Sequence, residues 1–269
     1  MSGEKTPTVL LLPGMSLNAT IFPDFGFPAV EPNLELLGPV EPDLGGRSHP
    51  IGLARHQRRL EEAIAESQEW ASSRRFVVAH SFGGMLALHW LTESREIQPD
   101  IDGLVLIGTT AGPMYQRVRP LIRNPWGAKW RFRVDWLVRF WNRPQAIKLV
   151  KRRLCKGRLD GDLQDFGKLR ITSDRELVLA GWRNTDWRAI HAYRMAMLGF
   201  DVRDRLGDMT VPTIVLHGTE DSLFAEADAH CIASALPRAE VRLVDGAGHA
   251  LPVTHGEEVN RALGDLVDS

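Results

Sequence analysis

The most constraining feature of this chain is residues 76–84, where a β-branched, aromatic run ends at Ser81 and a helical pattern begins. Small residues stand two positions before and two positions after the serine, at Ala79 and Gly83. A strand that turns into a helix through one serine with such neighbours predicts a nucleophile elbow. The turn pushes the serine Oγ out at the carboxyl edge of a sheet. The N–H groups that open the helix point the same way, where they can stabilise an anion.

Two features of this motif leave an alternative open. The first small position usually holds glycine, and here it is Ala79. Short motifs also match by chance. The alternative is a polar residue in a glycine-rich strand-to-helix turn that carries no chemistry.

The rest of the chain alternates strand and helix patterns. Helical patterns cover residues 51–70, 224–235 and 256–267, and further apolar runs of strand length cover residues 8–12, 34–40, 101–107, 211–217 and 241–244. Strands that are apolar on both faces suit a parallel sheet covered by helices on both sides. The sequence therefore predicts the α/β class, with a doubly wound, mostly parallel sheet of about six strands.

One long segment interrupts this alternation. Residues 113–200 show no strand pattern and fall between two core strands. We expect a core formed by residues 1–112 and 201–269, with residues 113–200 inserted as a helical lid.

Two loops after late strands supply partners for Ser81. Asp221 follows the strand that ends at His217, and His249 lies in a loop of small residues after the last strand. The order serine, acid, histidine, each at a strand end, predicts a catalytic triad. His249 would take the serine proton, and Asp221 would fix the imidazole tautomer and stabilise the imidazolium.

Each partner also has a simpler interpretation. Asp221 could be a turn or N-cap residue before the helix at 224, and Glu220 is a competing acid. His249 could be an ordinary loop histidine, one of nine in the chain. The histidines near the strands are expected to have packing or supporting roles: His80, His89 and His217.

Composition bounds the class of protein. The chain has 269 residues, 43% of them hydrophobic, which suits one α/β domain with an insertion. The net charge of −1 gives no indication of nucleic acid binding. Cys155 and Cys231 lack metal-type spacing, so we expect reduced thiols, a cytoplasmic location and no metal. No apolar run approaches the ~18 residues of a membrane span, and no signal peptide is expected.

The quoted motifs together resemble the α/β-hydrolase superfamily over residues 8–110 and 200–267. They are Leu11-Leu12-Pro13-Gly14, Ala79-His80-Ser81-Phe82-Gly83-Gly84, His217-Gly218-Thr219-Glu220-Asp221 and Gly246-Ala247-Gly248-His249. The resemblance implies an oxyanion hole formed by the backbone N–H groups of Met15 and Phe82. An ordinary Pro-Gly turn is the alternative for the first of these.

Two departures from the superfamily pattern stand out. Pro13 replaces the histidine that often precedes the oxyanion glycine, and the usual leading hairpin strands are not expected before Thr8. The loop Gly14–Phe22 is similar to that of carrier-protein methyl ester esterases of biotin synthesis. Serine at the elbow argues against haloalkane dehalogenases, which use aspartate there.

The lid segment is rich in tryptophan. Trp136, Phe140 and Trp141 share a helical stripe, and Trp182 and Trp187 follow later. These five side chains are candidates for an apolar wall over the nucleophile. The alternative is that they pack the lid onto the core.

The lid segment is also basic. It holds 20 Lys or Arg and seven Asp or Glu, against 13 basic and 27 acidic residues in the remainder. Such a face would attract an anionic substrate or an acidic partner, an acyl carrier protein included. It could equally be a solvated face that pairs with the acidic core. The candidate residues are Arg117, Arg119, Arg123, Arg131, Arg133, Lys151, Arg152 and Arg153.

The sequence therefore predicts a serine hydrolase that cleaves a carboxylic ester or thioester through an acyl-enzyme, without a cofactor or metal. An acyltransferase or another non-hydrolytic enzyme of the same fold, or a non-catalytic ligand-binding protein, stays open. The acyl chain, the leaving group and the oligomeric state are not predicted.

Overall fold

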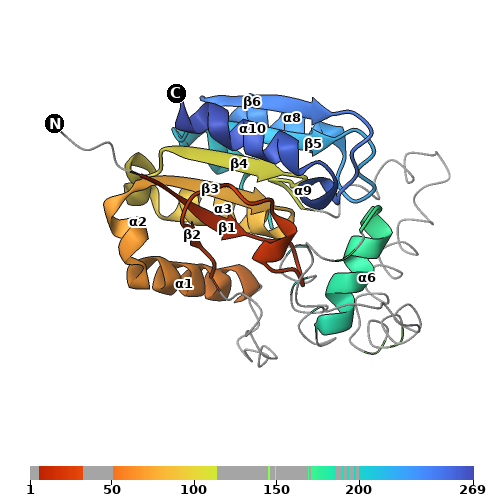
Figure 1. Cartoon of the computed structure of the whole chain (residues 1–269). Helices are drawn as coiled ribbons and strands as arrows, with labels where there is room; N and C mark the ends of the chain where they lie inside the picture. The colour runs from red at the N-terminus through yellow and green to blue at the C-terminus, as the bar shows by residue number, and fades with distance from the viewer. Residues whose placement is uncertain are drawn as a thin grey trace.

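The computed structural model describes residues 6–32, 51–113, 171–185 and 200–269, with single positions at 145, 149, 169, 190, 193 and 197. At its centre lies a six-stranded sheet in the order β2-β1-β3-β4-β5-β6, and each neighbouring pair of strands is parallel (Figure 1). The strands are β1 (Pro7–Leu12), β2 (Ala29–Val30), β3 (Arg74–His80), β4 (Gly103–Ile107), β5 (Thr213–Gly218) and β6 (Ala239–Val244).

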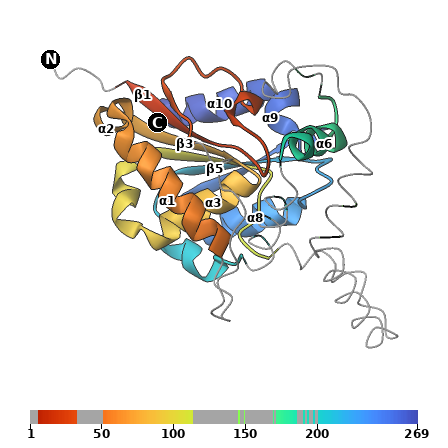
Figure 2. The same cartoon turned by 90° about the horizontal axis from the view of Figure 1, so that it is seen from below.

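Helices cover both faces of this sheet. The α-helices are α1 (Ile51–Glu66), α2 (Gln68–Ser72), α3 (Phe82–Glu93), α6 (Asp174–Asn184), α8 (Glu226–Ala235), α9 (Leu251–Thr254) and α10 (Gly256–Val267). Short 3₁₀ turns occur at Ala19–Ile21, Arg95–Asp100 and Arg203–Asp208. Figure 2 shows α1, α3 and α8 on one face, with α9, α10 and α6 toward the other.

Alternation along each strand explains this double cover. In β3, Val77 and Ala79 belong to the apolar cluster that includes α1, α3 and α8. Phe76 and Val78 belong to the cluster that includes α10 and the buried side of α6. Successive side chains of a strand point to opposite faces, so an all-apolar strand requires helices on both. The predicted α/β class with a doubly wound parallel sheet is confirmed.

The strand order reverses between β1 and β3. The chain leaves β1 toward β2 at one edge and then returns to β3 on the other side of β1, where Leu12 pairs with Ala79. Ligands of open α/β sheets bind outside the carboxyl ends of strands at such a reversal. The fold therefore brings the loop after Leu12 beside Ser81.

Some predicted boundaries differ from the observed ones. The helix predicted over residues 51–70 is two helices, because Ser67 accepts a hydrogen bond from the Trp70 N–H (3.2 Å) and caps α2. The strand predicted at residues 34–40 lies outside the described residues, and the edge strand that is described is β2. Within the predicted lid, residues 113–200, the structure describes the helix α6. The limits of the core and the lid remain a prediction.

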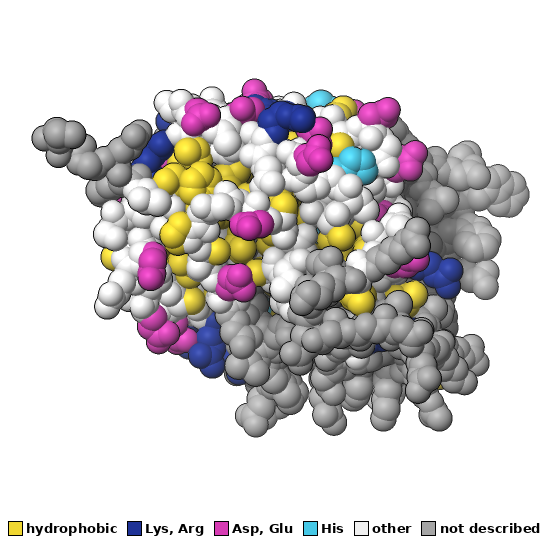
Figure 3. Space-filling view, in the orientation of Figure 1, with side chains coloured by type: hydrophobic (Ala, Val, Ile, Leu, Met, Phe, Trp, Pro, Cys, Tyr) yellow, Lys and Arg dark blue, Asp and Glu magenta, His cyan; other side chains and the backbone are white. Residues whose placement is uncertain are grey.

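The described surface of the core carries its acidic side chains singly, without a continuous patch on the face drawn in Figure 3. All eight Lys and Arg candidates of the basic lid lie outside the described residues. Cys231 is a free, exposed thiol. None of the described helices combines the length and hydropathy needed to cross a membrane.

Candidate active site

Ser81 occupies the sharp turn between β3 and α3. Its backbone has φ 53° and ψ −116°, and only 7% of the residue is exposed. The turn is fixed on both sides: the Ser81 N–H donates to the Ile107 carbonyl (2.9 Å), and the Thr109 hydroxyl donates to the Ser81 carbonyl (2.7 Å). A Cβ built at Gly83 would lie 2.0 Å from the Leu12 carbonyl oxygen, so only glycine fits there.

The described non-glycine residues with a left-handed backbone lie in this region. They are Ser16 (φ 65°) and Ser81, whose φ values are positive. Such conformations cost roughly 1–3 kcal/mol each and persist where the surrounding structure enforces them, often at functional sites. Ser16 follows β1 and Ser81 follows β3, so the two strained residues flank the strand-order reversal.

Asp221 and His249 form a buried pair. The Asp221 Oδ2 and His249 Nδ1 atoms are 2.9 Å apart, and the two side chains are 1% and 4% exposed. Asp221 Oδ1 accepts hydrogen bonds from the Leu223 and Phe224 N–H groups (2.7 and 2.8 Å). The turn interpretation of Asp221 thus holds alongside its pairing with histidine, although α8 begins only at Glu226.

The environment keeps the Asp221 carboxylate ionised. Burial raises its pKa, but the hydrogen bond and charge of His249 and the two N–H groups outweigh burial, so the pKa of Asp221 lies below its ordinary value. Glu220, the competing acid, is exposed and does not pair with His249. Asp221 is the acid that can orient the imidazole.

Gly108 and Thr109 support the site and were missed by the sequence analysis. A Cβ built at Gly108 would lie 3.0 Å from Asp221 Oδ2 and 3.2 Å from His249 Nδ1, and the residue has φ +49°. Thr109 holds the Ser81 carbonyl, as described above. The available signal was their place directly after β4, beside β3 in the sheet.

His80 links the nucleophile turn to the histidine loop. Its Nε2 donates to the His249 carbonyl (2.9 Å), and the two rings are 4.6 Å apart. Burial and the nearby His249 lower the pKa of His80 to about 3, although the bond to the His249 carbonyl opposes this. Because the neutral ring carries its proton on Nε2, its Nδ1 is a hydrogen-bond acceptor. Among the described residues, this buried Nδ1 has no hydrogen-bond partner. His89 and His217 are also buried.

The loop after β1 can present N–H groups to an anion. The Leu17 N–H donates to the Gly14 carbonyl (3.1 Å), which closes a turn with Met15 and Ser16 at its centre. The closing bond does not use the Met15 N–H. A Cβ built at Gly14 would lie 3.2 Å from the Ser81 Cβ, so this turn lies against the nucleophile. Phe82 is the first residue of α3, where N–H groups lack intrahelical partners.

Of the predicted wall residues, the structure describes Trp182. It is 9% exposed and forms a small apolar cluster with Ile190, against which Val178 and Met15 pack. Trp136, Phe140, Trp141 and Trp187 lie outside the described residues. In the described part of the chain, no three His, Cys, Asp or Glu side chains group as metal ligands.

The structure joins some predicted site residues directly and others indirectly. Asp221 bonds to His249, while Ser81 is linked to the histidine loop through its neighbour His80. Across the described residues, no hydrogen bond connects the Ser81 hydroxyl with the His249 ring. Nucleophile–base bonds are often long in unliganded enzymes and tighten when substrate binds.

The chain is similar to curated proteins over alignments of different length, as two of them show. It is 26% identical over 275 residues to the polyketide synthase ThaQ of Burkholderia thailandensis; the alignment covers all of this chain and 12% of that protein. It is 37% identical over 68 residues to the putative carbamate hydrolase RutD of Serratia proteamaculans, covering 25% of this chain and 26% of RutD. The chain thus spans a small part of both relatives.

Solved structures share the fold over the whole chain. A thermophilic esterase from Thermogutta terrifontis superposes with a TM-score of 0.61 at 19% identity, covering 99% of this chain and 90% of the esterase. The alpha/beta hydrolase family matches residues 9–262, which include both strained serines and the Asp221–His249 pair. By this match and by its six-stranded parallel sheet, the chain belongs to the alpha/beta hydrolase family.

Proposed function

We propose that the protein hydrolyses a carboxylic ester or thioester through an acyl-enzyme on Ser81. The observation that carries this proposal is the buried Asp221–His249 pair, with Nδ1 and Oδ2 at 2.9 Å, beside a serine on a strained strand-to-helix turn. A serine hydroxyl is a weak nucleophile by itself and needs a neighbouring base.

The proposed reaction has two halves, the acylation of Ser81 and the hydrolysis of the acyl-enzyme. Ser81 Oγ attacks the carbonyl carbon while its proton passes to His249 Nε2, and Asp221 stabilises the resulting imidazolium through Nδ1. The Met15 and Phe82 N–H groups hold the oxyanion. His249 then protonates the departing alcohol or thiol. Water attacks the acyl-enzyme with His249 as base, which releases the acid and restores Ser81.

Two observations favour an acyl substrate. The Thermogutta terrifontis protein of similar fold is an esterase. The relative aligned over the full chain is a polyketide synthase, and a polyketide is built from acyl units. Together with the basic segment 113–200, this favours an acyl group carried by an anionic partner such as an acyl carrier protein or coenzyme A. In this proposal Trp182 forms part of the acyl-binding wall, which is supported by the packing of Met15 against the cluster of Trp182 and Ile190.

Two alternatives keep the same site. In acyl transfer, an alcohol, thiol or amine resolves the acyl-enzyme in place of water. In a ligand-binding protein of this fold, the site binds without turnover.

The test compares p-nitrophenyl esters of increasing acyl length with matched acyl thioesters of coenzyme A, at low and high salt, using wild type and Ser81→Ala. We expect turnover that Ser81→Ala abolishes, with thioester turnover that falls as salt rises. Turnover that persists in Ser81→Ala would refute the mechanism.

The remaining outcomes separate the alternatives. Salt-independent hydrolysis of small neutral esters would identify a general esterase and would argue against an anionic partner. An acyl-enzyme that accumulates in water and disappears with an added thiol or amine would identify a transferase. A folded protein that neither turns over nor becomes acylated would favour the ligand-binding alternative.

A further inference from the structure

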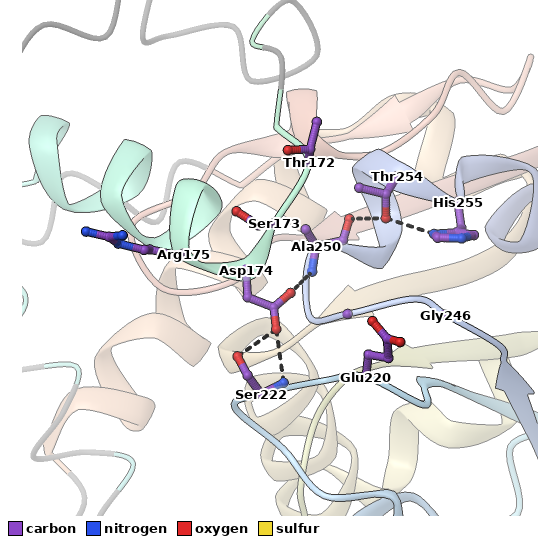
Figure 4. A pocket seen from close by; sticks show the side chains of 11 residues that line it. Thr172, Ser173, Asp174, Arg175, Glu220, Ser222, Gly246, Ala250, Thr254 and His255 are labelled. Carbon is purple, nitrogen blue, oxygen red and sulfur yellow. Dashed lines mark hydrogen bonds between the residues drawn. The ribbon is translucent and has the colours of Figure 1, made fainter.

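Asp174, the first residue of α6, contacts both loops that carry the acid and the base. Its Oδ2 accepts hydrogen bonds from the Ser222 N–H (3.0 Å) and the Ser222 hydroxyl (2.7 Å), and its Oδ1 accepts one from the Ala250 N–H (3.0 Å) (Figure 4). Ser222 directly follows Asp221, and Ala250 directly follows His249. One carboxylate thus bridges the positions next to both members of the buried pair.

The approach of Asp174 is close enough to restrict the histidine loop. A Cβ built at Gly248 would lie 2.4 Å from Asp174 Oδ1, so a side chain at position 248 would displace the carboxylate. The close contact with α6 therefore explains why the residue before His249 is a glycine.

An ordinary helix-terminus role does not account for these bonds. An acid in the first turn favours the helix dipole. However, Ser173 caps this helix, through its hydroxyl and the Glu176 N–H (3.4 Å), and Glu176 bonds the Thr172 N–H and hydroxyl nearby. The described hydrogen bonds of the Asp174 carboxylate instead all reach residues 48 or more positions away.

The same helix also contacts the turn after β1. A Cβ built at Gly181 would lie 2.8 Å from the Ser16 carbonyl oxygen, and Met15 packs against the cluster of Trp182 and Ile190. Because α6 is a single helix of 11 residues, it fixes its Asp174 end and its Gly181 end relative to each other. It therefore holds the acid loop, the base loop and the candidate oxyanion turn in one arrangement.

We infer that Asp174 is a positioning residue, which ties α6 of the inserted segment to the Asp221 and His249 loops and keeps the pair aligned with Ser81. This inference rests on the proposed function. Asp174 is not the sole tie between the loops, since the Glu220 N–H also donates to the Ala247 carbonyl (2.9 Å). We therefore expect its removal to impair turnover rather than abolish it.

A cavity of about 340 Å³ lies beside these bonds and makes a chemical rescue possible. It is lined by the N-terminus of α6 and both loops, with Asp174, Ser222, Gly248 and Ala250 among its walls (Figure 4). Formate is small enough to enter it and can supply the carboxylate that Asp174→Ala removes.

The experiment measures kcat and KM for p-nitrophenyl butyrate with Asp174→Ala and with Glu176→Ala as the matched control. Both variants remove one carboxylate from the first turn of α6, but the hydrogen bonds of Glu176 within the described residues reach Thr172 and Ser173, its own neighbours. We expect Asp174→Ala to lower kcat on the order of 10-fold with KM nearly unchanged, because small misplacements of reacting groups act on the chemical step. Glu176→Ala should stay within about twofold of wild type, consistent with a local surface role.

Formate should restore part of the kcat of Asp174→Ala and leave Glu176→Ala unchanged. The inference is overturned if Asp174→Ala matches Glu176→Ala, if its loss lies in KM, or if formate has no effect on it. Should Asp174→Ala fail to fold by circular dichroism, Ser222→Ala removes one of the three bonds, and wild-type kcat in that variant would overturn the inference.

The same set of variants distinguishes a failure of this inference from a failure of the proposed function. If Ser81→Ala and Asp221→Asn lose turnover while Asp174→Ala retains it, the triad stands and the positioning role falls. If Ser81→Ala retains turnover, the proposed function itself falls.

Discussion

Replacing Gly108 with alanine places a methyl group against the Asp221–His249 pair. The new Cβ would lie 3.0 Å from Asp221 Oδ2, where ordinary contact begins at 3.4 Å, so the carboxylate must move by a few tenths of an ångström. The Nδ1 and Oδ2 atoms are now 2.9 Å apart, and the new Cβ would lie within 3.2 Å of both, so relieving the contact displaces atoms of this hydrogen bond from their present geometry.

We expect two separable effects of Gly108→Ala. Alanine at φ +49° costs roughly 1–2 kcal/mol of stability, as at any left-handed position. The displaced pair should in addition lower kcat/KM about 10- to 100-fold, which corresponds to about 1.4–2.8 kcal/mol of transition-state stabilisation. The assay is ester hydrolysis with p-nitrophenyl butyrate, beside thermal unfolding monitored by circular dichroism.

Gly26→Ala is the matched control. Gly26 has φ +70° with nothing within 4 Å of its built Cβ, so alanine there brings the backbone strain without the contact. It should lose similar stability and keep its activity. Equal activity losses in the two variants, or full activity in Gly108→Ala, would refute the steric reasoning.

Three further predictions concern residues around the pair. Asp221→Asn should lower kcat by about 10²–10⁴-fold through the wrong imidazole tautomer, while Glu220→Gln stays near wild type; similar losses in both would refute the assignment of the acid. Thr109→Val should destabilise the fold by about 1–3 kcal/mol, since the Ser81 carbonyl loses a buried donor; an unchanged denaturant midpoint would argue against this bond. The lowered pKa of His80, about 3 against 6.5, means that the unfolded state binds the extra proton, so His80 makes stability fall as pH drops from 6.5 to 3. His80→Gln should flatten that slope in urea titrations, and an unchanged slope would contradict the burial argument.

The positions of the candidate residues could be predicted because local patterns set them. Ser81, Asp221 and His249 each follow an apolar strand, and the carboxyl ends of parallel strands share one edge of the sheet. The strand pattern and the small residues of these loops are visible in one sequence. Their places in the fold therefore agree with the prediction, and their catalytic roles remain the proposal made above.

The supporting contacts could not be predicted because they join distant segments. Asp174 has the sequence signature of a helix-terminus acid, and nothing local indicates bonds to Ser222 and Ala250. Gly108 follows an apolar run, and nothing in the local sequence shows that a Cβ there would lie 3.0 Å from Asp221 Oδ2 and 3.2 Å from His249 Nδ1. The break at Ser67 was missed because the apolar spacing continues to Trp70 while the cap interrupts the helix.

The central claim is that Ser81 is the nucleophile, activated by His249 and Asp221. The most direct measurement is intact-protein mass spectrometry after treatment with a fluorophosphonate, followed by peptide mapping of the adduct. The account predicts one adduct per chain on Ser81, no adduct in folded Ser81→Ala, and much slower labelling of Asp221→Asn. Equal labelling of wild type and Ser81→Ala, or an unlabelled but folded wild type, would contradict it.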